Sequence, residues 1–147
     1  MKLIRILVVA LAAGGALAPA AMSEQSVATR ATLTAHSSRF GKVLFDGRGF
    51  VLYAFTRDRG RSACYGPCAK AWPPYFAPKG TLSAGRGIKR SLLGTVKRKN
   101  GRRQVTYAGR PLYYYVGDTS PGAILCQNVV EYGGSWLILR PSGTLVR

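Results

Sequence analysis

The sequence contains one seven-residue pattern twice, as Leu52-Tyr53-Ala54-Phe55-Thr56-Arg57-Asp58 and, 60 residues later, as Leu112-Tyr113-Tyr114-Tyr115-Val116-Gly117-Asp118. Side chains of an extended strand alternate between its two faces. The tyrosine and the second aromatic residue of each copy therefore share one face, and the leucine points to the other. Each copy supplies one aromatic and one aliphatic face, which predicts strands that are buried on both sides.

The residues before each copy complete a hairpin. Strand-forming runs surround a glycine-containing turn in both places, namely Lys42 to Asp46 and Phe50 to Thr56 around Gly47-Arg48-Gly49, and Arg102 to Tyr107 and Pro111 to Val116 around Ala108-Gly109. The same shift of 60 residues superposes Gly41 on Gly101 and Gly49 on Gly109. We therefore predict two related hairpin repeats, about residues 39–58 and 99–118. Because a lone hairpin is marginally stable, we expect the two to pair.

Further strands are predicted outside the two patterns. β-branched and aromatic residues indicate strands at Ala31 to His36 and Leu92 to Arg98, and a C-terminal hairpin at Trp136 to Leu139 and Thr144 to Val146. Pro67 to Trp72 favours a helical turn. The expected fold class is all-β: a small single domain, residues 31–147, of two related β-hairpin repeats plus a C-terminal hairpin, with one short helical turn.

The N-terminal residues predict export. Residues 1–23 have the layout of a signal peptide, with Lys2 and Arg5 before an apolar run and small residues after it. That run is too short for a membrane-spanning helix, so we predict its removal and no transmembrane segment after processing. Residues 24–30 are expected to form a flexible leader. The first cysteine is Cys64. We therefore predict a secreted, periplasmic or cell-envelope protein that is not lipid-anchored.

The charge favours an anionic partner. The chain has 22 Lys and Arg residues against 5 Asp and Glu residues, a formal net charge of +17. Such a charge favours an anionic polymer or a membrane surface. Basic residues and tyrosines alternate around the second hairpin, and the predicted anion-binding residues are Lys97, Arg98, Lys99, Arg102, Arg103 and Arg110. The alternative is that these charges are scattered over a solvated surface and that the tyrosines pack in the core. No specific nucleic acid is predicted as a partner.

The order of short motifs resembles a known family, the bacterial secreted repeat of unknown function. Its Tyr-x-(Phe/Trp/Tyr)-x-x-Asp motif is matched by Tyr53, Phe55 and Asp58 and again by Tyr113, Tyr115 and Asp118. Family features between and after the copies include Cys64, Cys68, Trp72 and Trp136. Two departures are the missing lipidation cysteine and the presence of Cys126. The resemblance implies no activity, because the family has none assigned.

The three cysteines predict one disulfide and one free thiol in an exported protein. Residue spacing alone leaves three pairings open. A link to Cys126 closes the longer loop and would stabilise more in the chain-entropy model. The resemblance favours Cys64 with Cys68, because members of the family carry these two without the third. A redox role for this pair is a weaker alternative, since the spacing differs from that of thioredoxin-like sites.

Chemistry-bearing residues are otherwise sparse. Asp58 and Asp118 fit turn-forming positions, and the alternative is an acid–base or metal-binding pair. The single histidine, His36, would have to join the three cysteines to hold zinc. We therefore predict no catalytic residue, no metal and no cofactor. The predicted function is a non-catalytic exported module, with a redox or metal-dependent protein as the alternative.

Overall fold

Eight short strands and two short helical turns form the part of the chain that the structure, a computed structural model, describes, which is residues 30–147. The predicted signal peptide and all but the last residue of the predicted leader lie outside the described residues. The elements in chain order are β1 (Leu33–Ser38), β2 (Gly41–Asp46), β3 (Tyr53–Phe55), α1 (Pro67–Ala71), the 3-10 turn η1 (Arg90–Leu92), β4 (Leu93–Lys97), β5 (Arg103–Tyr107), β6 (Arg110–Pro111), β7 (Val129–Glu131) and β8 (Gly134–Ile138). The prediction of an all-β fold is confirmed.

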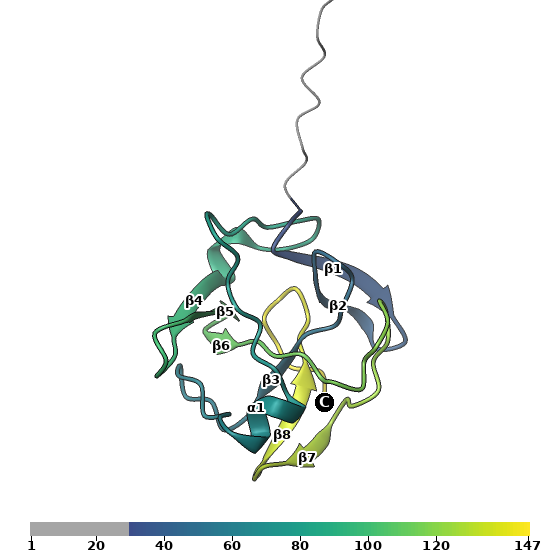
Figure 1. The fold of residues 1–147 in the computed structure, drawn as a ribbon. Coiled ribbons are helices and arrows are strands. Elements are labelled where there is room, and N and C mark those ends of the chain that lie inside the picture. The colour runs from purple at the N-terminus through teal and green to yellow at the C-terminus, as the bar shows by residue number, and fades with distance from the viewer. Residues whose placement is uncertain (1–29) are drawn as a thin grey trace, which may run out of the picture.

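The strands form three small antiparallel sheets, ordered β1-β2, β3-β8-β7 and β4-β5-β6. Figure 1 shows the β1-β2 hairpin and the β4-β5-β6 sheet on opposite sides of the molecule, with β3 between them. β3 is the end of the first hairpin repeat, yet its sheet partner is β8, where Phe55 lies opposite Trp136. The C-terminal segment is therefore part of the central framework.

The two repeats meet at equivalent residues. Tyr53 and Tyr113 form an antiparallel bridge in which each backbone N–H donates to the other residue's carbonyl oxygen at 2.9 Å. Because each residue occupies the same place in its own repeat, this contact resembles one between two units related by a local two-fold axis. The expected pairing of the two copies is confirmed at this point.

The repeats differ in register because their turns differ. Val51 lies opposite Phe45, and Pro111, 60 residues later, lies opposite Thr106, which is 61 residues after Phe45. The second repeat turns tightly at Ala108 and Gly109, both with positive φ, as a two-residue hairpin turn requires. In the first repeat the turn is wider, since the N–H of Asp46 donates to the carbonyl of Phe50. The predicted shift of 60 residues therefore does not relate β2 to β5, whose equivalent residues are 61 positions apart.

Two hydrophobic clusters cover the two faces of the paired segments. Leu52, Ala54 and Leu112 lie in one cluster, and Tyr53, Phe55 and Tyr113 lie in the other. This separation confirms the alternation predicted from the repeated pattern. In the aromatic cluster Trp136 stacks between Trp72 and Phe55, with ring centroids 4.0 and 4.2 Å away. The two tryptophans thus act as core residues, a role that favours stability.

Two predicted segments need correction, and one hairpin was not predicted. The strand expected from Pro111 to Val116 ends at Pro111, because the chain then crosses to pair with Tyr53. The β7-β8 hairpin was missed, since its turn contains Tyr132, a bulky residue at positive φ. The C-terminal hairpin is present in reduced form, as a bridge between Leu139 and Leu145.

Candidate functional site: a basic pocket beside the disulfide

A disulfide-closed loop follows the first copy of the motif. Asp58 accepts a hydrogen bond from the N–H of Ala63 at 2.7 Å, which starts the loop. Cys64 and Cys68 form a disulfide across Cα atoms 5.3 Å apart, and Pro67 begins α1, where its missing N–H costs nothing. The pairing that the family resemblance favoured is confirmed, and Cys126 keeps a free thiol.

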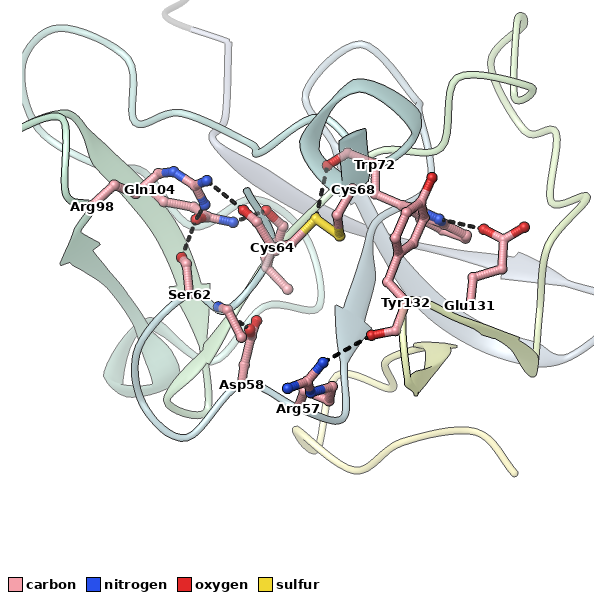
Figure 2. The surroundings of a disulfide bond; sticks show 12 residues. Arg57, Asp58, Ser62, Cys64, Cys68, Trp72, Arg98, Gln104, Glu131 and Tyr132 are labelled. Atoms are coloured by element: carbon pink, nitrogen blue, oxygen red, sulfur yellow. Dashed lines mark hydrogen bonds between the residues drawn. A yellow bond between two sulfur atoms is a disulfide. The ribbon is translucent and has the colours of Figure 1, made fainter. Parts of the chain in front are cut away.

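Arg98 lies buried beside this loop. Its guanidinium donates to Gln104 Oε1 at 2.7 Å and to the carbonyl of Cys64 at 2.6 Å, as Figure 2 shows. Only 5 % of the residue is exposed, and its guanidinium also lies over the Tyr65 ring at 4.3 Å. The expectation that Arg98 belongs to an exposed face needs correction. This arginine ties the disulfide loop to β5 and carries a fixed positive charge into the interior.

A pocket of about 400 Å³ opens above Arg98. It is lined by the disulfide loop and the end of β4, through Arg61, Ser62, Tyr65, Val96, Lys97, Arg98 and Lys99. We call this the basic pocket. Four of its lining residues are basic and none is acidic, so the local field favours an anion. Arg61, Lys97 and Lys99 are exposed around the buried charge of Arg98.

The other predicted basic residues lie elsewhere on the second hairpin. Arg103 is paired with Lys97 across β4 and β5 and donates to Thr95 Oγ1. The Arg102 guanidinium lies over the Phe76 ring at 3.3 Å. Arg110 is on β6, beyond the next turn. The structure therefore brings Lys97, Arg98 and Lys99 together with Arg61, a residue that sequence reasoning missed because it lies in the loop of the other repeat.

The tyrosines of the second repeat face inward. Tyr107 and Tyr113 are fully buried, and Tyr114 donates to Asp46 Oδ2 at 2.9 Å. The prediction that tyrosines form an exposed binding face therefore needs correction for these residues. Their rings belong to the core, as the alternative interpretation predicted. Tyr65 is the tyrosine of the basic pocket, and its hydroxyl accepts from the N–H of Lys99. Nothing in the sequence around Tyr65, which follows the first cysteine, indicated that it would line this pocket.

The motif aspartates bond across the two repeats. Tyr53 Oη donates to Asp118 Oδ2 at 2.7 Å, and the N–H of Leu125 donates to Asp118 Oδ1 at 2.9 Å. In the reciprocal pair, the Tyr113 hydroxyl faces Asp58, but neither Tyr113 Oη nor Asp58 Oδ2 makes a hydrogen bond of ordinary geometry with the described residues. The motif therefore places each tyrosine toward the other copy's aspartate. We call Tyr53 and Asp118 the closed pair, because they are hydrogen-bonded, and Tyr113 and Asp58 the open pair, because they are not.

Burial changes the acidity of both aspartates. It raises the pKa of Asp58 from its usual 3.8 to about 6, although the N–H of Ala63 opposes this shift. Burial also raises the pKa of Asp118, against the hydrogen bond from Tyr53. Each carboxyl has a structural partner, as turn-forming aspartates do.

In the part of the chain that the structure describes, His, Cys, Asp and Glu side chains nowhere gather in threes that could hold a metal ion. His36 lies within β1 and contacts Thr34 Oγ1 at 3.0 Å. Within residues 30–147, no helix has the length and apolar character needed to cross a membrane.

Comparison with known proteins gives one match. A family model described as a secreted repeat of unknown function matches residues 35–75 and 94–140. The matched regions contain both copies of the motif, the disulfide and both tryptophans. No curated protein and no solved structure matches the chain.

Proposed function

We propose, from the premise that this chain belongs to the family of secreted repeats of unknown function, that it is a non-catalytic module which attaches to an anionic polymer outside the cytoplasm. Residues 31–147 are its working domain, after removal of the signal peptide (1–23), and residues 24–30 serve as leader. The family supports an exported or envelope location.

The basic pocket carries this proposal. Its lining combines four positive charges with the hydroxyl groups of Ser62 and Tyr65. Arg98 cannot move away, because Gln104 and the Cys64 carbonyl hold its guanidinium. A fixed charge needs little ordering on binding, whereas the lysines at the rim can adapt to successive anionic groups. A phosphate-bearing polymer suits this arrangement.

The disulfide and the aspartates support a non-catalytic role. Cys64 and Cys68 are buried, so a thiolate has poor access to a substrate disulfide. Asp58 and Asp118 are bound by separate backbone N–H groups in separate loops. These observations argue against the redox and metal-dependent alternative. Its test is a thiol count on exported protein: a pair that resists mild reduction supports a structural disulfide, and ready reduction contradicts it.

The proposal is tested with polyphosphate as the probe at increasing salt. A triple variant, Arg61→Gln, Lys97→Gln and Lys99→Gln, is compared with a control that removes the same charge elsewhere, Lys42→Gln, Lys79→Gln and Lys89→Gln. All six positions are exposed. Binding of a polyanion falls steeply with salt, because it releases counterions.

We expect the pocket variant to lose about tenfold in affinity, since three charge contacts are removed, and the control variant to lose about threefold or less. Equal losses would mean that diffuse charge, not the pocket, binds the polymer. No binding at low salt would overturn the proposal. Stronger binding to anionic vesicles than to polyphosphate would assign the pocket to a membrane surface instead.

A further inference from the structure

A second and larger pocket lies against the β1-β2 hairpin. Its volume is about 660 Å³. It is lined by both ends of that hairpin and by the loop after Asp118, through His36, Ser37, Ser38, Arg39, Phe45, Gly49, Pro121, Gly122, Ala123, Ile124 and Leu125. None of these residues lines the basic pocket. We call it the hairpin pocket.

The hairpin pocket is preformed by bonds between its two walls. The N–H of Gly122 donates to the carbonyl of Gly49 at 2.9 Å, and Arg39 Nη2 donates to the carbonyl of Ile124 at 2.8 Å. The N–H of Leu125 is held by Asp118, the aspartate of the closed pair. The loop therefore lies fixed against the hairpin, and a ligand would not have to order it.

The interior of the hairpin pocket is apolar. Phe45 and Ile124 are almost fully buried at its base. Pro121 and Ala123 add apolar side-chain surface, and Leu125 is 64 % exposed at the pocket's edge. A large aliphatic side chain exposed beside a concave apolar surface is typical of a ligand site, because covering both removes apolar area from water.

The charge around this apolar surface has one sign. Arg39 is the cationic residue of the lining, and the lining contains no Asp or Glu. One of its donors is used on Ile124, and the guanidinium lies over the Phe40 ring at 4.8 Å. A guanidinium has five N–H donors, so others remain for an acid group. Its position is fixed by the bond to the backbone.

We propose that the hairpin pocket binds a single-chain amphiphile with an anionic head group, of the fatty-acid type. The alkyl chain lies along Phe45, Ile124 and Leu125, and the head group pairs with Arg39. His36, whose ring packs edge-on against Phe45 with centroids 5.4 Å apart, closes the aromatic end. This site is separate from the basic pocket, so either proposal can fail without the other.

The test uses decanoate below its micelle-forming concentration and protein recovered after export. Binding is followed by backbone amide shifts and by calorimetry, with decyltrimethylammonium as a probe of equal chain length and opposite charge. We expect amide shifts at residues 36–39 and 122–125 and at least tenfold weaker binding of the cation. Equal binding of the two probes, or shifts spread over the whole molecule, would overturn the proposal.

Two variants with matched controls locate the ligand. Leu125→Asp should reduce decanoate affinity at least tenfold, whereas Val130→Asp, at an aliphatic residue 72 % exposed on β7, should leave it unchanged. Arg39→Gln should reduce the preference for decanoate over the cation, and Lys42→Gln, outside the lining, should not. Unchanged amide spectra elsewhere confirm folding. Loss of affinity in both members of either pair would contradict the site.

Discussion

The two copies of the tyrosine–aspartate motif have the same sequence pattern but different bonding. Tyr53 and Asp118 form a closed pair at 2.7 Å, and the loop behind it is held by the N–H of Leu125. Tyr113 and Asp58 form the open pair, and the loop behind it is closed by a disulfide. The loop behind the closed pair lines the hairpin pocket, and the loop behind the open pair lines the basic pocket.

This difference shows that a repeat can keep its core and change its surface. The reciprocal backbone bonds at Tyr53 and Tyr113 are alike in length in both directions. The copies diverge on both sides of this contact: in the turns before it, which differ in register, and in the loops that the two aspartates start. Comparing matched substitutions in the two copies therefore separates what holds the fold from what shapes the loops.

The largest effect is expected from removing the aspartate of the closed pair. Asp118→Ala leaves the buried Tyr53 hydroxyl and the Leu125 N–H without an acceptor, which should lower the free energy of unfolding by about 3 kcal/mol. Asp58→Ala should cost about 1 kcal/mol, because it strands a single N–H in an exposed loop. Urea unfolding measures both. Equal losses would contradict the asymmetry.

Breaking the disulfide should have the next largest effect. Replacing both Cys64 and Cys68 by Ala should lower the free energy of unfolding by about 2 kcal/mol, the chain-entropy value for so short a loop. Cys126→Ala, in the other loop, is the control and should cost less than about 1 kcal/mol. A larger loss from the control than from the double variant would show that the hydrogen-bonded loop matters more than the covalently closed one.

Removing the tyrosine hydroxyls should give a smaller and sharper contrast. Tyr53→Phe removes the donor to Asp118 and should cost about 1.5 kcal/mol. Tyr113→Phe should change stability by less than about 0.5 kcal/mol, since its hydroxyl is buried without a partner in the described residues. Thermal and urea unfolding of the two variants give the comparison. A similar cost for both would show that the open pair closes in solution.

The buried carboxyl of the open pair should also make the stability depend on pH. The Asp58 carboxyl has a pKa of about 6 when folded and near 3.8 in the unfolded chain. Between these values the folded protein retains a proton that the unfolded chain releases. The stability from this group is therefore complete below pH 3.8 and is lost as the pH rises through about 6.

Asp58→Asn tests this dependence by urea unfolding between pH 4 and 7. Its stability should decline less steeply with pH than that of the unmodified protein. Some decline should remain, because burial also raises the pKa of Asp118. An unchanged slope would show that Asp58 titrates normally when folded.

The sequence predicted most of the strands and the two faces of the repeat, because alternation is a local property. Tyr53 and Leu52 could be assigned to opposite clusters from their spacing alone. The partner of β3 could not be predicted, since its pairing with β8 joins residues far apart in the chain. The register shift between the repeats could not be predicted either, because it depends on turn geometry rather than on composition.

The candidate site was predicted in part. Lys97 and Lys99 stand in a basic run that marks them as candidates from sequence alone. Arg98, in the same run, is buried instead, because Gln104 and a backbone carbonyl accept its hydrogen bonds. Arg61 was not predicted as a pocket residue, since it reaches the pocket from the loop of the other repeat. Which residues gather around one pocket depends on the cross-repeat packing, and no local pattern encodes that.

The reciprocal contact between Tyr53 and Tyr113 joins like to like, as the interface of a symmetric dimer does. Fusing two such partners end to end would produce the paired repeats of this chain. Fusion releases the halves from a strict constraint: in a dimer every substitution occurs twice, whereas here a cysteine can be added on one side alone. Covalent linkage of the halves is thus what allows one protein to offer two unlike pockets.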